Sequence, residues 1–409
     1  MPETPPPHTI LFVDHAIELS GAELSLLALL RGLDWARFRP VLVQPERGPL
    51  AAAAEEPGIE VRYVPMATEM RRISREMVRD RPLSSLSGFG RMLAPAWRIR
   101  RLIRETGAAI VHTNSVKAHF LGALAITGTP ARLVMHERNI LQPSLGLRGL
   151  RLIADRRAAC LIAISDAVAR PYREIMRRPE KVVTVHNGID PEPFARADGT
   201  AVRRDLGLDD SQPLVVQIGQ IARWKGQDVF VRAAAQVARE FPEARFAIVG
   251  RVVFPQNEAA YEEHLHTLAA HLRVQDRLIF AGHRTDIPAV LGAADLLVHA
   301  SVEPEPFGRV LIEAMAAGVP VAAAAAGGVP EIVVDGETGR LVPPGDPEAL
   351  ARAIGALLAS ADSRRAQGEA GRRRVAAEFT EDRMIAGVVR CYETVLAQGE
   401  RTPAEGREP

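Results

Sequence analysis

The 409-residue sequence contains very little cysteine and few aromatic residues. Only Cys160 and Cys391 are present, and Phe, Trp and Tyr together make up 5% of the chain. Two cysteines exclude a disulfide-stabilised scaffold and a cysteine-rich zinc site. We therefore expect both to be reduced, buried thiols.

Long apolar runs are also absent. The best candidate, Val310 to Ala326, is interrupted by Glu313, Gly318 and Pro320, whereas a membrane helix needs roughly 18 to 20 apolar residues. The polar residues Met1 to Pro7 lack the basic and apolar segments of a signal peptide. We therefore expect a cytoplasmic protein.

Motifs for metal binding are missing as well. The sequence has no Asp-x-Asp triplet, and its eleven histidines include no His-Glu-x-x-His arrangement. We therefore expect no metal site and no other cofactor, so that any phosphate group would be stabilised by Arg, Lys and helix N-termini.

Charge is distributed unevenly along the chain. The net charge is +1, but residues 1 to 190 carry +8 and residues 191 to 409 carry −7. Many of the arginines lie in residues 71 to 104, where they are interleaved with apolar residues. Such a stretch suits anionic lipid headgroups or acidic sugars and would give a peripheral membrane contact. A solvated helix face explains it equally well. No nucleic-acid motif accompanies the charge, so we expect no such partner. The arginines of this stretch are Arg71, Arg72, Arg75, Arg79, Arg81, Arg91, Arg98, Arg100, Arg101 and Arg104.

Strand-like apolar runs alternate with helix-length amphipathic segments, which predicts an α/β fold with two doubly wound, Rossmann-like domains facing a cleft. We expect an N-terminal domain at 1–190, a C-terminal domain at 191–379, a helix at 380–397 that packs back on the first domain, and a disordered tail at 398–409. The Pro-, Asp- and Gly-rich residues Gly188 to Pro213 are interpreted as the connection. The predicted strands are Thr9–Val13, Val41–Gln44, Val61–Val64, Ile110–His112, Arg132–His136, Cys160–Ile164, Val182–His186, Leu214–Ile218, Arg245–Val249, Leu278–Ala281, Leu296–His299 and Pro320–Ala323.

The strongest motif follows the predicted strand Leu296–His299 and runs from Glu305 to Gly318. Phe307 and Gly308 are placed at a helix start, where backbone N–H groups and the helix dipole favour an anion. Glu305 and Glu313 could accept hydrogen bonds from the vicinal hydroxyls of a sugar and a ribose. An ordinary helix cap with one surface glutamate would have the same spacing.

Two glycine-containing loops accompany this motif. Gly219 to Gly226 follows the opening strand of the second domain and offers Arg223 and Lys225 to a diphosphate. Gly327-Gly328 precedes a short helix and permits close approach of a ligand. Read alone, each is also consistent with an ordinary tight loop.

Together these three elements closely resemble glycosyltransferase family 4. Glu305 and Glu313 match its Glu-x7-Glu motif, and Gly219 to Gly226 matches its basic loop, with Gln220 where arginine is frequent. The resemblance covers most of the chain, since further family-like segments occur elsewhere. These are Ser20-Gly21-Ala22-Glu23, His112-Thr113-Asn114-Ser115, His136-Glu137-Arg138, Ile164-Ser165-Asp166 and Asn187-Gly188-Ile189-Asp190.

The resemblance implies a role for each matched residue. Glu313 would bind the donor ribose, and Glu305 would hold the transferred sugar together with backbone N–H groups. Arg223 and Lys225 would neutralise the leaving diphosphate, and His136 would contact the sugar. The implied catalytic residues are His136, Arg223, Lys225 and Glu305. The implied donor site consists of Gly21, Gly219, Arg223, Lys225, Glu305, Phe307, Gly308, Val310 and Glu313, and His112 and Asn114 are expected on the acceptor side.

The resemblance further implies a retaining hexosyltransferase of the GT-B type that uses a nucleotide diphosphate sugar. A UDP-sugar is favoured and GDP-mannose is next. The expected acceptor is a glycan or a lipid-linked molecule of cell-envelope or exopolysaccharide synthesis. A nucleotide-sugar epimerase of the same fold and a non-catalytic sugar-nucleotide-binding partner are the alternatives.

Overall fold

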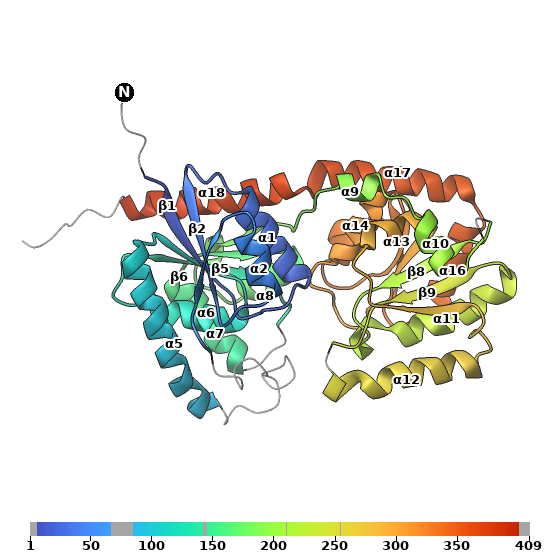
Figure 1. Cartoon of the computed structure of the whole chain (residues 1–409), viewed down its shortest axis with the longest axis horizontal. Coiled ribbons are helices and arrows are strands. Elements are labelled where there is room, and N and C mark those ends of the chain that lie inside the picture. Colours follow the sequence, from blue (N-terminus) through green and yellow to red (C-terminus); the bar gives the residue numbers. More distant parts are fainter. Residues whose placement is uncertain (1–5, 67–84, 142–144, 210, 254, 401–409) are drawn as a thin grey trace, which may run out of the picture. The chain divides into compact units, whose positions relative to one another are not determined.

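The structure is a computed structural model that describes residues 6–66, 85–141, 145–209, 211–253 and 255–400 (Figure 1). The chain divides into two compact units. The first unit consists of Met1–Gly188 and Glu381–Pro409, and the second of Ile189–Thr380.

The first unit is built on a seven-stranded parallel sheet with the order β3-β2-β1-β4-β5-β6-β7. Its strands are β1 (His8–Val13), β2 (Phe38–Gln44), β3 (Glu60–Tyr63), β4 (Ile110–Thr113), β5 (Arg132–Glu137), β6 (Ala158–Ala163) and β7 (Val182–Thr184). Its helices are α1 (Gly21–Gly32), α2 (Pro49–Glu55), α5 (Ser85–Thr106), α6 (Val116–Ala125), α7 (Leu145–Arg157), α8 (Asp166–Arg173), the 3-10 helix η2 (Pro179–Lys181) and α18 (Glu381–Glu400).

The second unit is built on a six-stranded parallel sheet with the order β10-β9-β8-β11-β12-β13. Its strands are β8 (Leu214–Ile218), β9 (Arg245–Val249), β10 (Leu278–Gly282), β11 (Leu296–His299), β12 (Val321–Ala324) and β13 (Gly339–Val342). Its helices are α9 (Glu192–Ala195), α10 (Thr200–Asp205), η3 (Arg223–Lys225), α11 (Gln227–Glu240), α12 (Pro255–His271), α13 (Ile287–Ala293), α14 (Arg309–Ala317), α15 (Val329–Ile332), α16 (Pro347–Leu358) and α17 (Ala361–Glu378).

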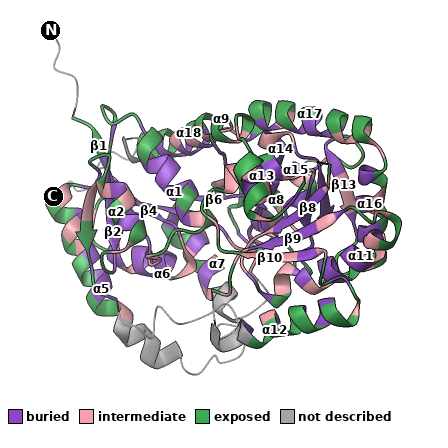
Figure 2. Ribbon diagram, turned by 45° about the vertical axis from the view of Figure 1, so that its right-hand side comes forward, coloured by how far each residue is buried: buried purple, intermediate pink, exposed green. Residues whose placement is uncertain are grey.

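Helices cover both faces of each sheet, so the central strands are buried nearly throughout (Figure 2). This is why the strand sequences are continuous apolar runs, such as Ile10–Val13, and do not alternate between apolar and polar residues. The two parallel sheets with alternating helices confirm the predicted α/β fold class. No described helix is both long enough and apolar enough to cross a bilayer.

The C-terminal helix α18 packs against α1 and β6 of the first unit, as predicted. Its apolar residues Met384, Val388, Tyr392 and Val395 join the core of that unit. The helix is longer than predicted and extends to Glu400, so 398–400 are helical and not part of a disordered tail. Residues 401–409 of that predicted tail lie outside the described residues.

Two predictions about the second unit need correction. Residues 188–213 are not a plain connection, because they contain α9 and α10, which pack against α13 and α14. Both helices are too short for a periodic apolar pattern to reveal them. The edge strand β13 was also not predicted, because its four residues include Gly339 and the charged Arg340.

Candidate functional site

Each sheet contains one pair of neighbouring strands from which the chain continues toward opposite edges of the sheet. In the second unit β8 and β11 are neighbours, and the chain continues from them toward opposite edges of the sheet. Loops that leave such strands diverge and open a crevice at their carboxyl ends, where ligands bind in doubly wound folds. The loop after β8 contains Gly219 to Gly226, and the loop after β11 contains Glu305.

Lys225 and Glu305 meet at this point of the second sheet. Lys225 Nζ lies 2.6 Å from Glu305 Oε2, and His299 Nε2 lies 3.2 Å from the same oxygen. Burial by itself would raise the pKa of the Glu305 carboxyl, but the Lys225 ammonium and the His299 hydrogen bond outweigh it and hold the pKa well below its usual value. Glu305 is therefore a carboxylate at neutral pH, and the two charges neutralise each other.

Glycines allow the three predicted loops to pack directly on one another. Gly226 has a φ of 65°, and a Cβ there would lie 2.1 Å from the Ala300 carbonyl oxygen. Gly327 has a φ of 67°, and a Cβ there would lie 2.1 Å from the Glu305 carbonyl oxygen. The Gly328 N–H also donates to that Glu305 oxygen. The segment from Ala300 to Glu305 thus packs at each end against a neighbouring loop, at positions where only glycine fits.

Helix α14 begins beside Glu305. Gly308 is its N-cap with a φ of 100°, and Phe307 is buried against Phe379, so the entry of the chain into the helix is fixed. Val310 is half-buried in the first turn, whose N–H groups have no acceptor within the helix. Glu313, one turn further, receives a hydrogen bond of 2.7 Å from Arg309 Nε.

Arg223 and Gly219 occupy different positions in the basic loop. The exposed Arg223 guanidinium lies over the Tyr261 ring, 5.0 Å from its centroid, and is not at Glu305. Gly219 has a φ of 152° and a Cβ there would lie 4.0 Å from Lys225 Cε, so the lysine stem passes over it. The structure therefore brings Lys225 and Glu305 together but leaves Arg223 to one side.

The first unit has its own reversal point, between β1 and β4, and a buried polar network lies there. Asn114 donates to Asp14 over 2.7 Å and accepts from Arg138 Nε over 2.6 Å, and Arg138 Nη1 reaches Asn187 over 2.9 Å. Asn114 is 3% exposed, so its amide holds Arg138 in place rather than reaching solvent. Asp14 and Arg138 had no assigned role in the sequence, although Asp14 directly follows a buried strand.

His136, His112 and Tyr392 form a buried chain of side chains. His136 Nδ1 lies 3.2 Å from His112 Nε2, and the Tyr392 hydroxyl lies 2.7 Å from His112 Nδ1. Both ring nitrogens of His112 are therefore occupied inside the first unit. In this arrangement the ring contacts His136 and Tyr392, and the acceptor-side role of His112 stays a prediction.

The protonation states along this chain follow from burial. Burial raises the pKa of Tyr392 well above its usual value and lowers the pKa of each histidine well below it. All three side chains are therefore uncharged at neutral pH, and the two contacts orient the imidazole rings. His136 Nε2 is buried and has no hydrogen-bond partner among the described residues.

Gly21 is the first residue of α1, and its neighbours form a capping box. Ser20 is the N-cap, and the Glu23 side chain returns to the Ser20 backbone N–H over 3.1 Å. Burial, reinforced by the nearby Asp14 charge, raises the pKa of Glu23. The Ser-x-x-Glu spacing is the signature of such a cap, which was not among the predictions made from the sequence.

The basic stretch is described only in part. Arg71, Arg72, Arg75, Arg79 and Arg81 lie outside the described residues, as does the Arg91 side chain. On α5, Arg100 donates to the carbonyls of Leu124 and Ala125, and Arg101 pairs with Glu105. Leu93 and Trp97 are 59% and 60% exposed. The described part is therefore an exposed apolar pair beside arginines, at least two of which already have partners.

A metal site was not expected from the sequence. Among the residues described, no three His, Cys, Asp or Glu side chains come together in a way that could hold a metal ion. Groups of the second unit with the charge or free N–H donors that suit an anion are Lys225, Arg223 and the first turn of α14.

Comparison with known families gives two matches that together span most of the chain. Residues 19–193 match the family described as Glycosyltransferase Family 4, and residues 198–374 match the family described as Glycosyl transferases group 1. The boundary between the two matches coincides with the short helix α9.

The chain is also similar to individual curated proteins. The chain is 33% identical to a D-inositol 3-phosphate glycosyltransferase of Salinispora tropica, over 71% of this chain and 60% of the relative. It is 28% identical to an N-acetyl-alpha-D-glucosaminyl L-malate synthase of Bacillus anthracis, over 57% and 59%. The chain thus spans about three fifths of the length of these curated relatives.

Solved structures match over nearly the whole chain. Anabaena HepE in complex with UDP-glucose has a TM-score of 0.79 and 27% identity, covering 95% of this chain and 99% of HepE. The same protein in complex with UDP has a TM-score of 0.81.

Proposed function

This chain belongs to glycosyltransferase family 4, and we propose that it transfers a hexose-type sugar from a nucleotide diphosphate sugar to an acceptor hydroxyl. The observation that carries the proposal is the Lys225–Glu305 pair, held by the two glycine-containing loops beside the first turn of α14. A cation, a carboxylate and a helix N-terminus in one place suit a diphosphate joined to a polyhydroxylated sugar. The HepE complexes support a UDP-sugar as donor, and GDP-mannose is the competitor to test.

Donor binding would separate the Lys225–Glu305 pair. Lys225 would turn to the diphosphate and Glu305 to the sugar hydroxyls, so both charges keep a partner when the ligand enters. Glu313 would accept from the ribose, and its present partner Arg309 holds it in position. His136 would offer its Nε2–H to a sugar oxygen.

We propose transfer with retention by front-face substitution and without a metal. The acceptor oxygen forms the new bond to the anomeric carbon as the bond to the phosphate oxygen breaks. The acceptor proton passes to that departing phosphate oxygen. The protein then contributes positioning and stabilisation of the leaving diphosphate, mainly through Lys225, Arg223 and the α14 N-terminus.

The proposed acceptor is an anionic glycan or lipid-linked molecule of cell-envelope or exopolysaccharide synthesis. The net charge of +8 in residues 1–190 supports an anionic acceptor. The names of two relatives refer to D-inositol 3-phosphate and L-malate, which are anions as well. We further propose a cytoplasmic enzyme that contacts anionic membrane through the exposed Leu93, Trp97 and neighbouring arginines of α5.

The test is a donor screen followed by product analysis. Purified protein is incubated with UDP-glucose, GDP-mannose and ADP-glucose, first without acceptor and then with phosphorylated and lipid-linked acceptors. Acceptor-dependent release of UDP, with an α-anomeric product by NMR, supports the proposal. Interconversion of nucleotide sugars without acceptor would instead indicate an epimerase, and donor binding without turnover would indicate a non-catalytic binding protein.

A further inference from the structure

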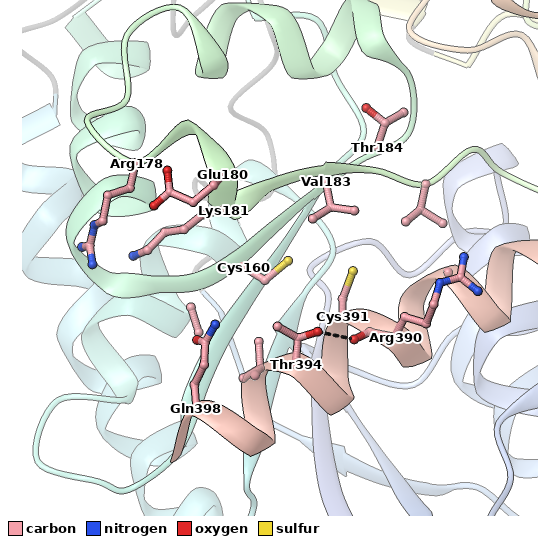
Figure 3. Close-up of a pocket in the computed structure, with 14 residues that line it drawn as sticks. Cys160, Arg178, Glu180, Lys181, Val183, Thr184, Arg390, Cys391, Thr394 and Gln398 are labelled. Atoms are coloured by element: carbon pink, nitrogen blue, oxygen red, sulfur yellow. Dashed lines mark hydrogen bonds between the residues drawn. The ribbon is translucent and has the colours of Figure 1, made fainter. Parts of the chain in front are cut away.

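The only two cysteines of the chain lie beside each other in the first unit. Cys160 is on β6 and Cys391 is on α18, and 230 residues separate them in the sequence. Both are reduced and buried, and both line the same cavity (Figure 3). Figure 3 shows their thiols pointing into the gap between the strand and the helix, and each thiol shifts the pKa of the other. The sequence predicted two reduced, buried thiols but did not predict that they are neighbours.

The cavity gives small molecules access to this pair. It has a volume of about 400 Å³, many times that of a water molecule, and lies between η2, β7 and α18. Its wall includes the exposed Arg390 and Thr394 of α18, so it is open to solvent. Lys181 lies on the opposite wall, where its ammonium donates to the Ala158 carbonyl. Arg178, Lys181 and Arg390 outnumber Glu180 among the lining residues, so the cavity carries a net positive charge.

We propose that Cys160 and Cys391 form a redox-active dithiol that hydroperoxides convert to an intramolecular disulfide. The Cys391 thiolate attacks one peroxide oxygen, the O–O bond breaks, and the other oxygen leaves as water or an alcohol after taking up a proton. The Cys160 sulfur then attacks the resulting sulfenic acid, forms the S–S bond and expels the oxygen as a second water. The two thiols are oxidised and the hydroperoxide is reduced.

The environment of the two thiols sets their order of reaction. The hydrogen bond from Cys160 lowers the pKa of Cys391, and the Arg390 charge adds to this effect. The same hydrogen bond and burial raise the pKa of Cys160. Arg390 precedes Cys391 on α18 and lines the same cavity, where its charge favours the Cys391 thiolate, so we assign Cys391 as the thiol that reacts first and Cys160 as the thiol that resolves the sulfenic acid.

Formation of the disulfide would fix α18 to β6. The linkage would close a very long loop, so it should stabilise the first unit against unfolding. It would also fix the position of Tyr392, the next residue, whose hydroxyl bonds to His112. The chemistry of the pair is independent of the proposed transferase activity.

The experiment treats the reduced full chain with a small molar excess of hydrogen peroxide. Free thiols are then counted under denaturing conditions, and peptides are mapped by mass spectrometry without reduction. We expect loss of both thiols, one intrachain Cys160–Cys391 peptide pair, reversal by dithiothreitol, and a Tm that rises by about 4 °C or more on oxidation. Thiols that both stay reduced, or a disulfide only between chains, would overturn the proposal.

Single variants test the order of reaction. Cys160→Ala should leave Cys391 as a sulfenic acid that dimedone labels, whereas Cys391→Ala should leave Cys160 unlabelled. The double variant should show no Tm change with peroxide, which separates the disulfide from general oxidation. Alanine is suited to these buried sites because a free cysteine packs as a small apolar residue. Equal dimedone labelling of both single variants would contradict the assigned roles.

Discussion

The hydroxyl of Tyr392, near the C-terminus, lies 2.7 Å from Nδ1 of His112. This contact places a residue of α18 behind the strand-end histidines of the first unit. It orients the His112 ring, whose other nitrogen contacts His136 Nδ1. The last helix therefore both covers the core and helps to orient a residue of the proposed site.

Tyr392→Phe should lower kcat about tenfold, which corresponds to one lost hydrogen bond of about 1.4 kcal/mol. The ring still packs against Phe38, so folding should be preserved, but His112 loses the hydroxyl contact that orients its ring beside His136. Steady-state kinetics against donor, with a pH profile, measure the effect. Tyr63→Phe, at an exposed tyrosine, is the control. A Tyr392→Phe enzyme with unchanged kcat and pH profile would remove Tyr392 from the mechanism.

Lys225→Ala should weaken binding of a nucleoside diphosphate more than binding of the nucleoside. Calorimetry with UDP and uridine makes the comparison, and Arg232→Ala on the exposed face of α11 is a matched control. Equal loss for both ligands would show that the lysine does not contact the diphosphate. The variant should also lose about 2 to 3 kcal/mol of stability at neutral pH, because a largely buried carboxylate loses its partner.

The contribution of Glu305 to the pH dependence of stability should change sign in the Lys225→Ala variant. In the wild type the pKa of Glu305 is lowered on folding, so its contribution is complete above its ordinary value of 4.5 and is lost as the pH falls toward the folded value. Without Lys225, burial is no longer balanced and the pKa of Glu305 should rise. Protonation would then stabilise the variant, and its stability difference from the wild type should shrink as the pH falls. Urea unfolding at several pH values below neutrality tests this slope.

Glu305→Gln and Glu313→Gln should each lower kcat/KM for donor about 10- to 100-fold, the loss expected for a hydrogen bond to a charged group. Glu305 is at the end of the loop that follows β11, and Glu313 is in α14, so neither substitution opens the core. Circular dichroism should confirm an intact fold. Unchanged kinetics for both variants would show that the donor binds elsewhere.

The sequence predicted the local elements well because parallel sheets impose continuous apolar strands with turns between them. It could also place Lys225 and Glu305 at one site, since each follows a strand of the second domain and the family resemblance assigns both to the donor. It could not show that they form an ion pair, because that depends on the glycine contacts at 226 and 327. Tyr392 and Cys391 could not be assigned partners either, since nothing local indicates where a C-terminal helix packs.

Activity should survive treatment with EDTA and dialysis. The prediction rests on the absence of an Asp-x-Asp triplet and on the cations near the proposed diphosphate position, Lys225 and Arg223. Donor turnover is measured before and after chelation, with and without added Mn²⁺ or Mg²⁺. Complete loss that either ion restores would contradict the proposed metal-independent substitution.

Membrane contact by α5 is best tested at exposed side chains that make no hydrogen bond needed for the fold. Arg100 is unsuitable, because its guanidinium holds the carbonyls at the end of α6, and a glutamate there would disrupt the fold. Trp97 and Arg98 are exposed, so Trp97→Ser with Arg98→Glu should leave folding intact. Each basic residue near an anionic surface contributes about 1 kcal/mol, and salt screens this attraction.

Co-sedimentation with vesicles of phosphatidylglycerol and phosphatidylcholine gives the measurement. Binding of the wild type should increase with the anionic lipid and decrease at high salt, and the Trp97→Ser, Arg98→Glu variant should bind several-fold less. Substitution of Ile175, an exposed apolar residue away from α5, by Ser should leave binding unchanged. If the wild type remains in the supernatant with anionic vesicles at low salt, the proposed membrane contact is wrong, and a water-soluble acceptor becomes the better candidate.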